Sequence, residues 1–175
     1  QSGGVIAIAT PFDKEIAKHN IALNRTVTGY GTVRMQRIAA DKAVAAGRSS
    51  KEVAADRATY FYRAASPSSI SAPVISGGGD LTELLANKKL DIKDIEEKKL
   101  PESVRKMKPK EREAYLKKQV EDRNKAQAKL KGLLKKRADF IAKKNAELKK
   151  AGKLKGFDAQ VQNLIREQAA PKGIA

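Results

Sequence analysis

The residues from Pro109 to Ala151 constrain the fold more than any other part of the chain. They contain no further proline and a single glycine, Gly132. Because proline and glycine are the residues that most often end helices, we expect one uninterrupted helix here. At about 1.5 Å per residue such a helix is roughly 65 Å long, more than a small domain needs to cover its core. We therefore expect a strut, a coiled-coil arm or a surface for a polyanion.

The same stretch carries most of the excess positive charge. Residues 110–155 hold 17 Lys and Arg against six Asp and Glu, which gives this window +11 of the +17 net charge of the chain. Clustered cations can neutralise several phosphates and give binding that weakens steeply with salt. The candidate polyanion-binding residues are Lys129, Lys131, Lys135, Lys136, Arg137, Lys143, Lys144, Lys149 and Lys150.

Three features favour a solubilising helix surface over a nucleic-acid site. The lysines surround most of the helix, lysine outnumbers arginine 14 to 3 in the window, and aromatic residues are scarce. Proteins that read sequence favour arginine, and proteins that bind single strands favour aromatic side chains. Nucleic-acid binding is therefore the alternative and not the preferred interpretation.

Composition does not favour one large core, because 33% of residues are charged, 5% are aromatic and tryptophan is absent. The absence of cysteine excludes disulfides and thiolate metal sites. No apolar run approaches the ~20 residues of a membrane-spanning helix. The chain opens on Gln1 without an initiator methionine or a signal-peptide pattern, so we expect further sequence upstream.

The predicted fold is mainly α. Val5 to Ala9 (VIAIA) is typical of a buried strand, which needs partner strands from upstream sequence or another molecule. The predicted regions are 1–31, this closing strand and a helix; 32–65, a helical hairpin; 66–79, a Ser/Pro/Gly linker; 80–108, short helices; 109–151, the long basic helix folded against short helices; and 152–175, a final helix and tail.

Cap signals set the expected helix starts. Thr10 with Asp13 indicates the first helix and Ser49 with Glu52 the third, both as reciprocal capping pairs, and Asp80 caps a helix after the linker. The second helix should run from Val33 to Ala46. The apolar residues expected to close the hairpin are Val33, Ala40 and Val44 against Val53, Tyr60 and Phe61.

The long helix gives only a partial coiled-coil pattern. Its a positions are Val120, Gln127, Leu134, Ile141 and Leu148, and its d positions are Leu116, Arg123, Leu130, Arg137 and Lys144. A stable seam needs apolar residues at both positions, and three of the five d positions are cationic. We therefore favour packing of this stripe against the chain's own short helices over a self-associating coiled coil.

No catalytic, cofactor-binding or metal-binding residues are predicted. His19 is the single histidine and has no second ligand at metal spacing. Thr10 and Asp13 are better explained as helix caps than as a ligand pair. Gly77 to Gly79 before Asp80 lacks the strand and the GK[ST] ending of a P-loop, which favours a hinge over an anion cradle. No nucleophile, base and orienting group occur as a set.

Two passages carry a resemblance to a known family. GGVIAIATPFDKEIAKHNIALNRTVTGYG resembles the closing strand and helix of the von Willebrand factor A (vWA) domain in a group of exported bacterial proteins. The passage from Gly79 to Leu148, including LPESVRKMKPKEREAY, resembles the region downstream of that domain, as does GFDAQVQNLIREQA. Lys108 stands where that group usually has Ser or Thr.

The resemblance implies an upstream vWA domain and an extracytoplasmic location. The Asp-x-Ser-x-Ser metal loop of such domains does not occur in these residues, so no metal role is carried over. The preferred hypothesis is a non-enzymatic stalk, scaffold or docking arm with a protein partner or self-association. The alternative is a basic nucleic-acid or polyanion-binding protein. A third hypothesis is that the chain is part of an enzyme whose catalytic residues lie upstream.

Overall fold

The computed structural model describes residues 9–65 and 69–150, which are mainly helical, as the sequence predicts. The described part contains no β-strand, only an isolated antiparallel bridge between Gly29 and Asp80. The helices are α1 (Asp13–Arg25), α2 (Val33–Gly47), α3 (Lys51–Ala64), α4 (Leu81–Ala86), the short 3-10 helices η1 (Ile92–Asp94) and η2 (Glu97–Lys99), α5 (Glu102–Arg105) and α6 (Pro109–Lys150). The expected strand at 5–9, except Ala9, and the expected helix at 159–169 lie outside the described residues.

The chain divides into two compact units. Residues 11–136 form one, which we call the helical unit, and residues 1–10 with 137–175 form the other. Helix α6 belongs to both, with its residues 109–136 in the helical unit. In the second unit the described residues are 9, 10 and the α6 residues 137–150.

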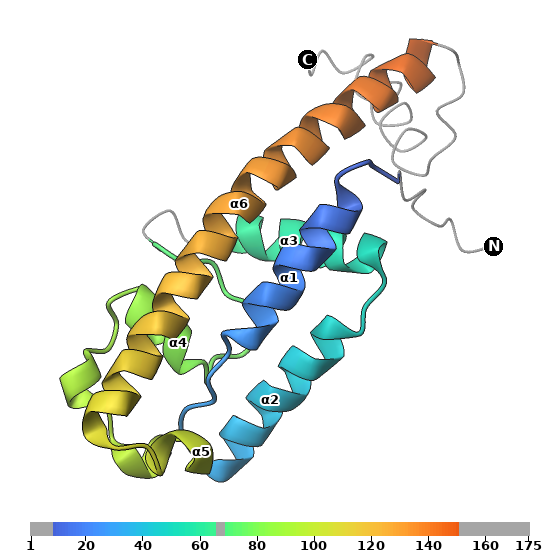
Figure 1. Cartoon of the computed structure of the whole chain (residues 1–175). Coiled ribbons are helices and arrows are strands. Elements are labelled where there is room, and N and C mark those ends of the chain that lie inside the picture. The colour runs from blue at the N-terminus through green and yellow to red at the C-terminus, as the bar shows by residue number, and fades with distance from the viewer. Residues whose placement is uncertain (1–8, 66–68, 151–175) are drawn as a thin grey trace, which may run out of the picture. The chain divides into compact units, whose positions relative to one another are not determined.

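Helix α1 is the central element of the helical unit's N-terminal part, since it contacts both α2 and α3 (Figure 1). Ile16 and Leu23 lie seven residues apart on one face of α1, and both are buried. Ala55 and Ala58 of α3 are buried in the same cluster. Their short side chains allow the two helix backbones to approach closely.

Helices α2 and α3 form where predicted, but the expected apolar interface between them is wrong. Val33 is 81% exposed, and Val44, Val53 and Tyr60 are exposed as well. Both helices bury alanines instead, and both pack on α1. Helices α2 and α3 are therefore held together through α1. Their alanine faces pack on it because short side chains permit closer packing than the β-branched side chains on their other faces.

Side-chain caps fix the starts of α2, α3 and α4, and two helix starts are shifted from the prediction. The Asp80 carboxylate caps α4, as expected, by accepting from the Thr82 backbone N–H. Helix α3 is capped by Ser50 and not Ser49, because the Ser50 hydroxyl accepts from the Val53 backbone N–H. Helix α1 begins at Asp13 with Phe12 at its N-cap, two residues later than expected.

Two hydrophobic clusters form the core of the helical unit. The alanine cluster joins α1, α3 and α6, and the leucine cluster joins α4, α5 and α6. The buried members of the alanine cluster are Ile16, Leu23, Ala55, Ala58, Val74, Ala126, Leu130 and Leu134. Those of the leucine cluster are Leu81, Leu100, Val104 and Leu116.

Within the helical unit, α6 contributes to both clusters. Leu116 lies in the leucine cluster, and Leu130 and Leu134 lie in the alanine cluster. The apolar stripe of α6 thus packs against the shorter helices of the same chain. This confirms the expectation of a long helix folded against short ones.

Candidate functional site

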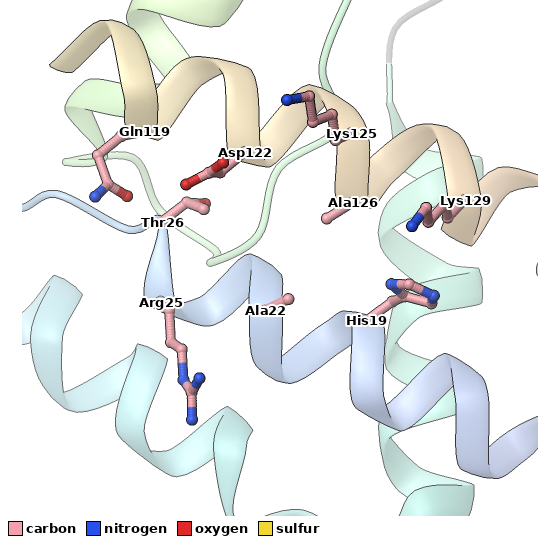
Figure 2. Close-up of a pocket in the computed structure, with 9 residues that line it drawn as sticks. All are labelled: His19, Ala22, Arg25, Thr26, Gln119, Asp122, Lys125, Ala126 and Lys129. Atoms are coloured by element: carbon pink, nitrogen blue, oxygen red, sulfur yellow. The ribbon is translucent and has the colours of Figure 1, made fainter. Parts of the chain in front are cut away.

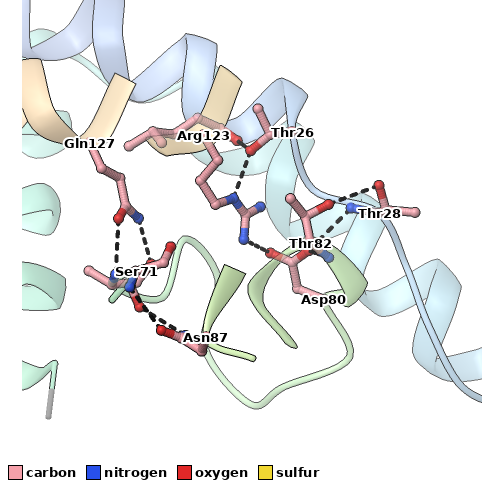
Figure 3. Close-up of polar contacts among 10 residues, drawn as sticks. Thr26, Thr28, Ser71, Asp80, Thr82, Asn87, Arg123 and Gln127 are labelled. Atoms are coloured by element: carbon pink, nitrogen blue, oxygen red, sulfur yellow. Dashed lines mark hydrogen bonds and ion pairs between the residues drawn. The ribbon is translucent and has the colours of Figure 1, made fainter. Parts of the chain in front are cut away.

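A buried ion pair holds α6 to the start of α4. Nη1 of Arg123 lies 2.7 Å from Oδ2 of Asp80, and both side chains are fully buried (Figure 3). Nε of Arg123 donates to the Thr26 hydroxyl at 2.9 Å, which ties the same guanidinium to the end of α1. Arg123 therefore links three segments that are far apart in the sequence.

The other carboxylate oxygen of Asp80 is also engaged. Oδ1 accepts from the backbone N–H groups of Thr28 at 3.2 Å and Thr82 at 3.1 Å. The Thr28 and Thr82 hydroxyls lie 3.1 Å apart and hydrogen-bond each other. A buried charge is tolerated when it is paired and hydrogen-bonded in this way. Because neither charge is accessible, we assign this cluster a structural role and no role in catalysis.

Sequence reasoning found only half of this ion pair. It placed Asp80 as a helix cap, but Arg123 entered as one of the cationic d positions that weaken a coiled-coil seam. The sequence does offer one signal for the burial of Arg123, which is its spacing. Arg123 lies seven residues after Leu116 and seven before Leu130, both of which are buried. An arginine at that spacing in a buried stripe requires a buried carboxylate, and Asp80 supplies it.

Two side-chain amides fix the loop that leads to Asp80. Gln127 of α6 accepts from the Ala72 backbone N–H and donates to the Ala72 carbonyl, at 3.0 and 2.7 Å. Asn87 makes the same two bonds with Ser71, at 2.8 and 3.0 Å (Figure 3). The described part of the predicted linker is thus an ordered loop between α3 and α4.

The three glycines before Asp80 are structural. Gly77, Gly78 and Gly79 have φ angles of 85°, 74° and 79°, which other residues adopt at a cost. The Gly79 carbonyl accepts from the Tyr30 backbone N–H at 2.8 Å. This geometry turns the chain so that Asp80 enters the buried cluster.

A groove of about 380 Å³ lies between α1 and α6 (Figure 2). We call it the α1–α6 groove. Ala22 on α1 and Ala126 on α6 line it, and their short side chains leave the space between the helices unfilled. Its other lining residues are His19, Arg25, Thr26, Gln119, Asp122, Lys125 and Lys129.

Positive charge dominates the His19 end of this groove. His19 of α1 faces Lys129 of α6 across it (Figure 2). Partial burial, followed by the positive charge of Lys129, lowers the pKa of His19 below its ordinary value of 6.5. Lys18 also lowers this pKa, whereas Glu15 raises it. The imidazole is therefore neutral at pH 7.

The one carboxylate that lines the groove, Asp122, is already paired. Asp122 lies 2.6 Å from the Lys118 ammonium, and Lys125 pairs with Glu121. Lys129 makes no ion pair with any described residue. Among the residues that line the groove, Lys129 and Arg25 carry charges without an ion-pair partner in the described part of the chain, and Lys129 lies on the wall opposite His19.

The nine predicted cations fall in both units of the chain, four in the helical unit and five in the other. Lys129, Lys131, Lys135 and Lys136 are exposed on α6 in the helical unit, and none pairs with a carboxylate among the residues described. Arg137 is buried and belongs to the other unit. Lys144 pairs with Glu147 at 2.7 Å, and the remaining predicted residues, Lys143, Lys149 and Lys150, are exposed.

A second, larger groove of about 570 Å³ is mostly apolar. Phe61 and Tyr62 of α3, Pro73 and Val74 of the loop, and Leu130 of α6 contribute to its lining. Asn124 and Lys131 lie on the α6 side. Sequence reasoning did not predict either groove, because both arise where α6 passes residues from distant parts of the chain.

Other classes of site find no support in the described residues. There, no group of three or more His, Cys, Asp or Glu could hold a metal ion. None of the helices in that part of the chain is long and apolar enough to cross a membrane. Comparison with protein-family models, curated proteins and solved structures finds no match.

Proposed function

We propose that this chain is a non-enzymatic interaction region in which α6 serves as a docking arm for a protein partner. The observation that carries the proposal is the contrast between the two faces of α6 in the helical unit. One face is held by Leu116, the fully buried Arg123, and Leu130. The opposite face is exposed and lysine-rich, and it is free to make contacts outside the unit.

The anchoring explains how a helix with so polar a surface keeps a fixed place. Polar helices of this kind gain little from burial and need tertiary contacts to remain ordered. Arg123 and Gln127 supply such contacts to Asp80 and Ala72. The helix can therefore present its exposed side chains in a fixed orientation.

The sequence resemblance supports the wider setting of this proposal. Residues 3–31 resemble the end of a vWA domain, which leads us to propose that the arm belongs to an extracytoplasmic vWA-domain protein of bacteria. The partner is then a protein that assembles with it, or a second copy of the chain.

Site-directed photo-crosslinking in the full-length protein tests the docking arm. A photoreactive residue in place of exposed Lys131 on α6 should form a crosslink to a protein, whereas one in place of exposed Asp41 on α2 should not. Both positions are accessible, so the pair controls for exposure. Equal crosslinking from both positions, or crosslinking to nucleic acid alone, contradicts the proposal.

A specific observation favours a second candidate, polyanion binding by the exposed lysines. Lys129, Lys131, Lys135 and Lys136 lie within eight residues, and none pairs with a described carboxylate. If they bind duplex DNA, the slope of log K against log salt should be about −0.9 per phosphate contacted. Charge reversal at Lys135 and Lys136 should then flatten the slope.

If α6 is a docking arm, we expect a different result for DNA binding. DNA binding at 150 mM salt should be weak and non-specific, with a Kd between about 0.1 mM and 1 μM, as for many basic surfaces. Tight binding that selects one sequence or structure at this salt concentration would favour the polyanion function instead.

A further inference from the structure

The α1–α6 groove combines a cation, a titratable ring and a neutral donor on two facing helices. His19 lies on the α1 wall, and Lys129 and Gln119 lie on the α6 wall (Figure 2). None of these three makes a hydrogen bond or ion pair with another described residue. Their donors therefore remain available to a ligand.

The spacing of the lysines on α6 suits more than one anionic group. Lys125 and Lys129 are four residues apart, so their Cβ atoms lie about 6 Å from each other on one face of the helix. Lys125 forms an ion pair with Glu121, so it should bind an anion more weakly than Lys129 does. Arg25 also lines the groove, but its guanidinium is turned away from α6 (Figure 2).

We propose that the α1–α6 groove binds a chain of two or more phosphate groups, with Lys129 and His19 contacting one phosphate from opposite walls. Lys125 contacts the next phosphate along α6, and Gln119 donates its amide at the far end of the groove. Ala22 and Ala126 leave room for the ligand. The site lies beside the docking arm and shares Lys125 and Lys129 with the exposed, lysine-rich face of α6.

The chemistry of His19 supplies a built-in reporter. An anion bound beside the imidazole favours its protonated form, which opposes the effect of Lys129. The pKa of His19 should therefore rise on binding. Because His19 is the only histidine in the chain, its ring protons give a single, unambiguous set of NMR signals.

The test is a ¹H NMR titration of the full chain with tripolyphosphate at 150 mM salt. We expect a saturable shift of the His19 signals and a raised pKa in the complex. Lys129→Gln should weaken binding about fivefold, as expected for loss of an exposed charge contact. Lys135→Gln removes the same charge from an exposed position outside the groove, and binding should stay within about twofold.

A second variant tests the groove without altering charge. Ala126→Leu places a larger side chain in the groove, and it should abolish the His19 shift while circular dichroism shows the helices intact. A single-stranded oligonucleotide, titrated in parallel, distinguishes the source of the phosphates. A His19 shift with both ligands assigns the groove to phosphate chains in general, and a shift with tripolyphosphate alone assigns it to free polyphosphates.

Three results would overturn the proposal. The first is an equal loss of affinity in Lys129→Gln and Lys135→Gln, which would indicate a diffuse charge effect. The second is binding of either ligand without any shift of the His19 signals. The third is unchanged binding in a folded Ala126→Leu variant.

Discussion

The two hydrophobic clusters of the helical unit are built from side chains of different size. The leucine cluster is formed by Leu81, Leu100, Val104 and Leu116, whereas three of the eight buried residues in the alanine cluster are alanines. Neither groove is lined by a buried residue of the leucine cluster. Both grooves are lined by residues of the alanine cluster. The comparison indicates that the leucine cluster anchors α6, while the alanine cluster leaves space for ligands.

Arg123 lies between these two clusters along α6. It follows Leu116 and precedes Leu130 at equal spacing, and its charge is neutralised by Asp80. A pair of leucine-sized apolar residues could fill the same space, but it would not make the hydrogen bonds to Thr26 and Thr28. The ion pair therefore fixes where along α6 one cluster ends and the other begins.

The largest effect should come from breaking this ion pair. Asp80→Ala leaves Arg123 buried without a counterion and removes the α4 cap, so we expect a loss of about 3–5 kcal/mol in the free energy of unfolding. Urea denaturation measures it. Glu121→Ala removes an exposed partner of Lys125 and should cost less than about 1 kcal/mol. Similar losses in both variants would contradict the anchoring role of Asp80.

The next largest loss of stability is expected at a leucine of the leucine cluster, compared with a leucine beside the alanine cluster. Leu116 is 1% exposed in the leucine cluster, so Leu116→Ala should cost about 3 kcal/mol by creating a cavity. Leu133 is only partly buried beside the alanine cluster, so Leu133→Ala should cost about 1 kcal/mol. Thermal unfolding of the two variants checks the order. A larger loss at Leu133 would reverse our assignment of the anchor.

The third effect adds volume to the alanine cluster at two positions. Ala55 is fully buried between α1 and α3, so Ala55→Leu should overpack the core and cost about 1–3 kcal/mol. Ala126 is buried in the same cluster but also lines the α1–α6 groove, so part of a leucine side chain can extend into that space and Ala126→Leu should cost less, about 1 kcal/mol. Denaturant midpoints of both variants measure the difference. Equal losses would show that the groove is not open in solution.

Much of the fold follows from local sequence signals. The uninterrupted run after Pro109 predicted α6, and the sequence marked Val33 as the start of α2 and Asp80 as the cap of α4 correctly. These signals act within a few residues, which is why one sequence suffices to find them. The Ser49 cap missed by one residue, because adjacent serines offer the same hydroxyl to different backbone N–H groups.

The contacts between distant residues could not be predicted in this way. Arg123 pairs with Asp80 across 43 residues of chain, and nothing local to either residue names the other. The α1–α6 groove likewise depends on how α1 and α6 pack at Ala22 and Ala126, which are far apart in the sequence. The nine cations were found from charge alone, but their distribution between two units was not foreseen.

The smallest predicted effect concerns His19 at the edge of the alanine cluster. Its pKa is lowered in the folded protein, mainly by burial and then by Lys129, so the unfolded chain binds this proton more readily. Stability should therefore fall as pH drops below about 6.5, the unfolded value, and level off below the folded pKa. His19→Gln should remove this part of the pH dependence between pH 7.5 and pH 5, which denaturation curves at each pH would measure.

In Lys129→Gln the NMR pKa of His19 should rise toward its ordinary value, since one of the two main causes of the shift is lost. An unchanged pKa in that variant would show that Lys129 does not face His19 in solution, and would remove the charge from the site where the phosphate is proposed to bind.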